Sequence, residues 1–90
     1  MIASVQISET IPLLVRAIDS DNYEDAIWIF RGIKSLIRLL KAQYGRGMDY
    51  SKLDEVMENL EFALESGMEW AKELQQEFLY LLTDLGIPIK

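Results

Sequence analysis

The sequence predicts an all-α protein, an antiparallel helical bundle of three helices built on a long coiled-coil-like hairpin. Two observations lead to this prediction. Apolar residues recur with the alternating spacing of four and three that defines a heptad repeat, over two long segments. Turn-forming residues separate these segments, and no stretch alternates with period two for long enough to suggest a sheet. We expect residues 1–90 to form a single domain.

The first helix is expected near residues 9–19. Its apolar residues share one face, as in a helix that is buried on one side: Ile11, Leu14, Val15 and Ile18. Pro12 falls in the first turn if Ser8 or Thr10 is the cap, where its missing N–H does no harm. Residues 2–7 alternate weakly, which is compatible with an extended segment.

The second helix is expected near residues 22–44, after the polar cluster 19–22. Capping arrangements are expected where one polar residue precedes another by three positions: Asp21 before Glu24, and Ser51 before Asp54. The segment 44–47 contains two glycines and ends the second helix. The third helix is expected near residues 51–85, and Gly86 followed by Pro88 stops it.

The sequence allows a register to be proposed for antiparallel packing of the two long helices. With Tyr44 beside Leu53, the large side chain of Phe30 falls beside Gly67, which would give a glycine inside a helix a packing role. The alternative is that the helix breaks or kinks at Ser66-Gly67. The same register places opposite charges across the hairpin: Lys41 with Asp54, Lys34 with Glu61, and Arg31 and Arg38 facing Glu58 and Glu65.

The apolar content exceeds what a two-helix hairpin can bury. The opposite flank of the hairpin is largely apolar and needs a cover, which the first helix can supply. The end of the long helix, around Phe78, is apolar nearly all round and projects beyond Ala26 in this register. We therefore expect a homodimer or docking on another protein, with partner-binding residues Trp28, Phe62, Trp70, Leu79, Tyr80 and Leu82. The alternative is a bent long helix whose last turns fold back onto the core.

Composition excludes several kinds of chemistry. The chain has no Cys and no His, so it lacks disulfides, thiolate ligands, Cys nucleophiles and the commonest general base. The glutamates of the third helix point away from the seam, as on a solvated acidic face, and no metal site or cofactor is expected. No serine has a plausible base partner. The sequence therefore predicts a protein that is not an enzyme.

A basic stripe runs along the second helix at spacings of three, four and three: Arg31, Lys34, Arg38 and Lys41, with Arg46 beyond it. It is expected to pair with the acidic residues of the third helix. The alternative is a phosphate-contacting face of a nucleic-acid-associated accessory protein, acting directly or through a partner. A net charge of -6 argues against binding nucleic acid or anionic membrane in bulk.

The expected function is a non-catalytic protein–protein interaction module or small accessory subunit that presents an apolar helical face and self-associates. The N-terminal segment has no basic residue before its apolar positions, so it is not a secretory signal. Strictly apolar runs, such as Ala26–Phe30, do not exceed five residues, which is too short to span a membrane. A cytoplasmic location is expected.

Overall fold

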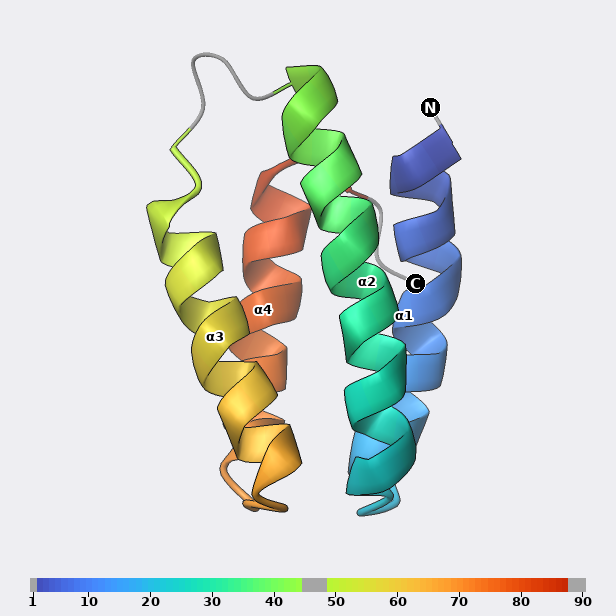
Figure 1. The fold of residues 1–90 in the computed structure, drawn as a ribbon, viewed down its shortest axis with the longest axis vertical. Helices are drawn as coiled ribbons and strands as arrows, with labels where there is room; N and C mark the ends of the chain where they lie inside the picture. Colours follow the sequence, from blue (N-terminus) through green and yellow to red (C-terminus); the bar gives the residue numbers. More distant parts are fainter. Residues whose placement is uncertain (1, 45–48, 88–90) are drawn as a thin grey trace.

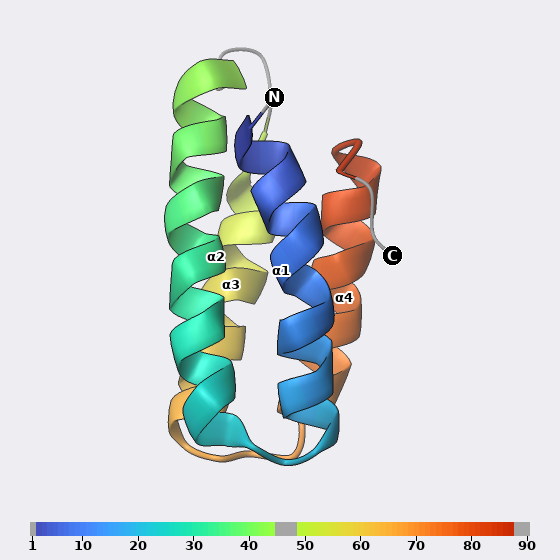
Figure 2. The same ribbon diagram turned by 90° about the vertical axis from the view of Figure 1, so that its right-hand side faces the viewer.

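The computed structural model describes residues 2–44 and 49–87, and these residues form four helices with no strand. The helices are α1 (Ile2–Asp19), α2 (Tyr23–Tyr44), α3 (Ser51–Glu65) and α4 (Ala71–Asp84). Successive helices run in opposite directions and contact one another, and α1 also contacts α4, which closes the ring (Figures 1 and 2). The result is an up-down-up-down bundle of 35 × 23 × 18 Å.

The predicted continuous helix over 51–85 is divided into α3 and α4. Gly67 adopts a left-handed conformation, with φ of 63°, which ends α3. The N–H of Met68 donates to the carbonyl of Ala63 (2.9 Å) and the N–H of Gly67 to that of Leu64 (3.3 Å), the pattern of a Schellman motif. The alternative of a break at Ser66-Gly67 is therefore the one the structure adopts.

The predicted contact between Phe30 and Gly67 is replaced by two others. The side chain nearest to a Cβ placed on Gly67 is that of Tyr23, whose Cδ2 would lie 3.8 Å away. Phe30 instead meets Phe78 of α4. Because α4 folds back along α3 (Figure 1), the predicted overhang beyond Ala26 does not form. The apolar side of α4 is buried in the core.

The first helix starts at Ile2 and not near residue 9. Ala3 and Ile7 are buried in line with the predicted apolar face, so their burial favours the helix over an extended segment at residues 2–7. Pro12 consequently lies inside α1 and not in its first turn. The first helix covers the flank of α2, while α4 covers α3, so the apolar flank of the hairpin is shared between two helices.

Helix ends differ from the expected caps by one or two positions. Asn22, and not Asp21, caps α2: its Oδ1 accepts from the N–H of Asp25 (3.4 Å) and its Nδ2 donates to Asp25 Oδ2 (2.8 Å). The N-cap of α3 is Tyr50 and not Ser51, and Asp49 Oδ1 accepts a hydrogen bond from the N–H of Ser51 (2.9 Å). Gly86, with φ of 88°, ends α4 as predicted. The glycine turn expected at 45–47, and Pro88, lie outside the described residues.

Among the described residues, no helix is long and apolar enough to cross a membrane.

Candidate interaction surface

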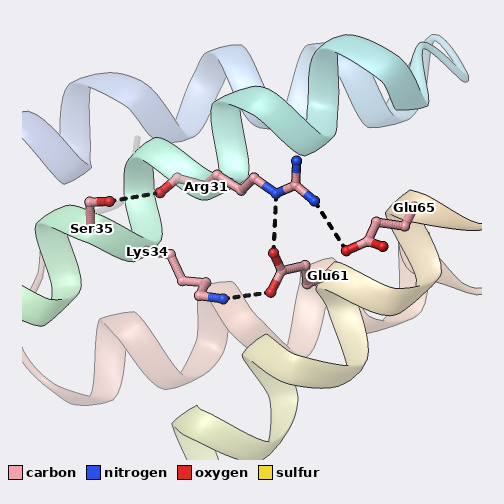
Figure 3. Close-up of polar contacts among 5 residues, drawn as sticks. All are labelled: Arg31, Lys34, Ser35, Glu61 and Glu65. Carbon is pink, nitrogen blue, oxygen red and sulfur yellow. Dashed lines mark hydrogen bonds and ion pairs between the residues drawn. The ribbon is translucent and has the colours of Figure 1, made fainter.

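The interface between α2 and α3 is lined by ion pairs (Figure 3). Arg31 bridges two carboxylates, with Nε 3.2 Å from Glu61 and a terminal nitrogen 3.2 Å from Glu65. Lys34 Nζ lies 2.5 Å from Glu61 Oε1. Lys41 pairs with Asp54. The predicted pairs Lys34–Glu61 and Lys41–Asp54 are present, which confirms the antiparallel register of the hairpin.

Three of the four cations in the basic stripe are thus occupied by α3. The hydrogen bond from Lys34 holds the pKa of Glu61 below its usual value, so the carboxylate stays charged beside the two cations. Arg38 is exposed and makes no ion pair within the described part of the chain. Arg46 lies outside the described residues. This geometry agrees with interhelical pairing as the role of the stripe.

Four of the six predicted partner-binding residues are exposed. The exposed fraction is 67% for Trp28, 60% for Phe62, 41% for Trp70 and 70% for Tyr80. Leu82 is fully buried, because α4 folds back and turns this residue into the core. Leu79 is half-buried and packs against the core. The structure therefore removes Leu82 from any solvent-facing surface of the monomer.

Phe62 and Trp70 form an exposed aromatic pair, with ring centroids 6.3 Å apart and planes inclined by 34°. Phe62 lies in the last turn of α3, and Trp70 directly precedes α4. The turn that begins at Gly67 brings the two rings together. Met68, in the same turn, is also exposed. We call Phe62 and Trp70 the aromatic pair.

A second exposed group lies along the outer face of α2, at Trp28, Gly32, Ser35 and Leu39. These positions recur at the helical spacing of four, three and four, so they share one face. The guanidinium of Arg31 lies 5.5 Å from the ring centroid of Trp28. Ser35 Oγ donates to the carbonyl of Arg31 within the same helix (3.2 Å), so its hydroxyl is satisfied without a partner molecule (Figure 3). We call this group the α2 face.

Carboxylates follow the aromatic pair along both of its helices. Glu58 and Glu55 precede Phe62 by four and seven residues, and Glu73 and Glu77 follow Trp70 by three and seven. All four are exposed, and none makes an ion pair within residues 2–44 and 49–87. We call these four residues the acidic rim. No group of three or more described carboxylates is arranged to hold a metal ion.

Sequence reasoning missed a polar cluster where the α1–α2 turn meets α4. Asp21 lies 3.0 Å from Lys72 Nζ and accepts a hydrogen bond from the Tyr23 hydroxyl (3.2 Å). The hydrogen bond from Lys72 lowers the pKa of the Asp21 carboxyl. The signal was hidden because Lys72 approaches Asp21 only after the chain reverses at Gly67. The exposed Val5 and Leu13 lie outside the apolar face predicted for the first helix, and Val5 also precedes its predicted start near residue 9.

No protein-family model matches the chain, and comparisons with curated proteins and with solved structures give no match.

Proposed function

We propose that the protein is a non-catalytic interaction module, a small accessory subunit that docks on another protein or on a second copy through exposed aromatic side chains. The observation behind this proposal is the exposure of Trp28, Phe62, Trp70 and Tyr80 around a core that is already filled. Contiguous exposed apolar groups mark interaction sites on soluble proteins.

The stability of the fold does not explain why aromatic residues occupy these four exposed positions. The ring of helices buries Phe30 and Phe78 fully, whereas Trp28 and Phe62 add little to that core. Burying an aromatic side chain contributes about 1.5–3 kcal/mol, so four exposed rings are a large unused potential for association. Tryptophan and tyrosine are also enriched among the residues that dominate binding energy at interfaces. Association is the process that would use them.

The α2 face has a pattern suited to self-association. Trp28 and Leu39 are large, and the residues between them, Gly32 and Ser35, are small. In an antiparallel arrangement of two copies, Trp28 of each copy meets Leu39 of the other, and Gly32 meets Ser35. A two-fold dimer requires this kind of self-complementary surface. Nothing lies within 4 Å of a Cβ placed on Gly32, so there is room for a neighbouring side chain.

The molar mass in solution, measured over a range of concentrations, tests the proposal. Trp28→Ala is expected to weaken self-association through the α2 face, whereas Phe62→Ala is expected to weaken docking on another protein through the aromatic pair. Because both side chains are exposed, the circular dichroism of the helices is expected to stay unchanged. Leu13→Ala, an exposed apolar residue of α1, is the matched control. If both test variants associate as the unmodified chain does, the interface assignment is wrong.

The ion pairs between α2 and α3 do not support the alternative of a nucleic-acid-binding face. Arg31, Lys34 and Lys41 would have to exchange their carboxylate partners on α3 for phosphates. Salt-sensitive binding of DNA or RNA that is lost in the double variant Arg31→Glu/Arg38→Glu would be required to restore this alternative.

A further inference from the structure

The two sides of α3 carry carboxylates in different states. On the side toward α2, Asp54, Glu61 and Glu65 are neutralised by lysine and arginine. On the face that carries Phe62, the exposed Glu55 and Glu58 make no ion pair within the described part of the chain. Carboxylates without an ion pair are therefore left next to the aromatic pair.

The neighbouring helix repeats this arrangement. Glu73 and Glu77 extend from Trp70 along the exposed side of α4, and α4 lies beside α3 (Figure 1). The acidic rim therefore consists of two rows on adjacent antiparallel helices, and both rows start at the aromatic pair. Each row covers about two helical turns, or ~10 Å. A ligand that is apolar at one end and cationic over this length would satisfy both features.

We propose that the aromatic pair and the acidic rim bind a cationic amphipathic helix of another protein. Its apolar side chains would cover Phe62 and Trp70, and its arginines or lysines would pair with carboxylates of the acidic rim. This inference rests on the proposed function and specifies the partner of the aromatic pair.

The chain already contains an internal example of such a contact. Arg31 lies over the ring of Trp28 (5.5 Å) and at the same time reaches Glu61 and Glu65. One guanidinium therefore contacts an aromatic ring of α2 and two carboxylates of α3 at the same time. Arginine suits this geometry because its planar group stacks on rings while its N–H groups bind carboxylates. A partner arginine between Trp70 and Glu73 would repeat this combination.

Charge argues against a second copy as the occupant of this surface. Two copies meeting through it would place one acidic rim against the other, in a chain with a net charge of -6. Like charges placed directly opposite each other at an interface are unfavourable. Nucleic acid and anionic membranes are repelled for the same reason. The aromatic pair therefore calls for a cationic partner, whereas the self-complementary α2 face suits a second copy.

The test uses the full chain and a labelled synthetic helix of about 18 residues, ~27 Å long, whose binding face has leucine at one end and arginine along the following two turns. The comparison peptide has glutamate in place of arginine. Fluorescence anisotropy is expected to show binding of the arginine peptide at least about tenfold tighter than that of the glutamate peptide. Equal affinity for both peptides, or binding of neither, contradicts the proposed partner chemistry. If self-association persists in that case, the proposed function survives.

Matched variants separate local recognition from overall charge. Glu58→Gln/Glu73→Gln is expected to weaken binding of the arginine peptide about tenfold. Glu9→Gln/Asp19→Asn changes the net charge equally, on exposed positions of α1, and is expected to change affinity less than about twofold. Equal losses in the two variants would show that only net charge matters and would overturn the proposed site.

The aromatic pair is tested separately from the rim. Phe62→Ala and Trp70→Ala are each expected to weaken peptide binding by more than about tenfold, with an unchanged helical signal. If both leave peptide binding unchanged, the assigned site is wrong. If Trp28→Ala also leaves self-association unchanged, the proposed function fails as well.

Discussion

The rings of Phe30 and Phe78 meet edge to face inside the bundle, with centroids 5.5 Å apart and planes inclined by 73°. Both side chains are fully buried. They belong to α2 and α4, which are not neighbours in the ring of helices, so their contact crosses the core. Edge-to-face pairs contribute about 0.5–1.5 kcal/mol beyond the burial of their area. The contact links the returning helix α4 to the α2–α3 hairpin.

Phe78→Ala is expected to lower the free energy of unfolding by about 3–5 kcal/mol, because it leaves a cavity against Phe30. Urea denaturation followed by circular dichroism measures this change. Tyr80→Ala, two residues away and exposed, is the control and is expected to stay within about 0.5 kcal/mol of the unmodified chain. If Phe78→Ala unfolds the chain, Phe78→Leu is expected to fold with a smaller loss. Equal stability of Phe78→Ala and Tyr80→Ala would contradict the packing of α4 described above.

Two glycines with different backbone conformations are expected to respond in opposite directions to alanine. Gly67→Ala places a Cβ on a left-handed residue and is expected to reduce the free energy of unfolding by about 1–2 kcal/mol. Gly32→Ala lies inside α2 with open space around the new methyl, so it is expected to raise stability by about 0.5–1 kcal/mol. Both are measured by urea denaturation. A stabilising effect of Gly67→Ala would show that α3 and α4 form one continuous helix.

The ion pairs of Glu61 predict a dependence of stability on pH. The hydrogen bond from Lys34 lowers the pKa of Glu61 in the folded state relative to the unfolded state. The resulting stabilisation is fully present above the unfolded pKa and is lost as pH falls through the folded pKa. The urea midpoint is therefore expected to fall as pH is lowered from about 6 to about 3. At pH ~6 the urea midpoint of Glu61→Gln should lie below that of the unmodified chain. At pH ~3 the difference between the two midpoints should be smaller.

The control for this pH prediction is Glu58→Gln, which removes an exposed carboxylate with no ion pair among the described residues. Its stability is expected to follow that of the unmodified chain at both pH values. If Glu61→Gln differs from the unmodified chain equally at pH ~6 and ~3, the carboxylate of Glu61 does not supply the pH dependence.

The α2–α3 hairpin could be predicted from the sequence because two independent patterns agree on its register. Heptad spacing aligned the helices, and the charges of Lys34 and Lys41 met their partners on α3 as expected. The return of α4 was harder to predict because the heptad spacing continues through the turn. Leu64 and Ala71 are seven residues apart, and both face the same core although the chain reverses between them. Periodicity alone therefore does not locate the break at Gly67.

The sequence predicts the exposed residues whose position depends on a single helix. It does not predict the contact that depends on the turn between α3 and α4. Trp28 and Phe62 occupy outward positions of their own helices, so the heptad pattern alone predicts that they are exposed. Heptad spacing places Leu82 on the surface because it predicts last turns that project from the bundle, whereas the structure buries this residue. The contact between Phe62 and Trp70 requires the reversal at Gly67, which spacing did not specify.

Gln75 is the polar side chain of α4 that is buried in the core, with 5% of its surface exposed, and its Oε1 has no hydrogen-bond partner in the described structure. A buried acceptor without a partner costs about 1–3 kcal/mol. Gln75→Met keeps the length of the side chain and removes this cost, so it is expected to raise the free energy of unfolding by about 1–2 kcal/mol. For a domain of this size, the melting temperature should rise by about 4–8 °C per kcal/mol.

The control for Gln75→Met is Gln76→Met, the same substitution at the adjacent exposed position, which is expected to change stability by less than about 0.5 kcal/mol. Thermal and urea unfolding measure both variants. A loss of stability in Gln75→Met that Gln76→Met does not show would mean that the amide of Gln75 is hydrogen-bonded in solution. In that case the side chain would stabilise the packing of α4 as a polar contact inside the core, and the apolar contacts of Phe78 and Leu82 would share that role with it.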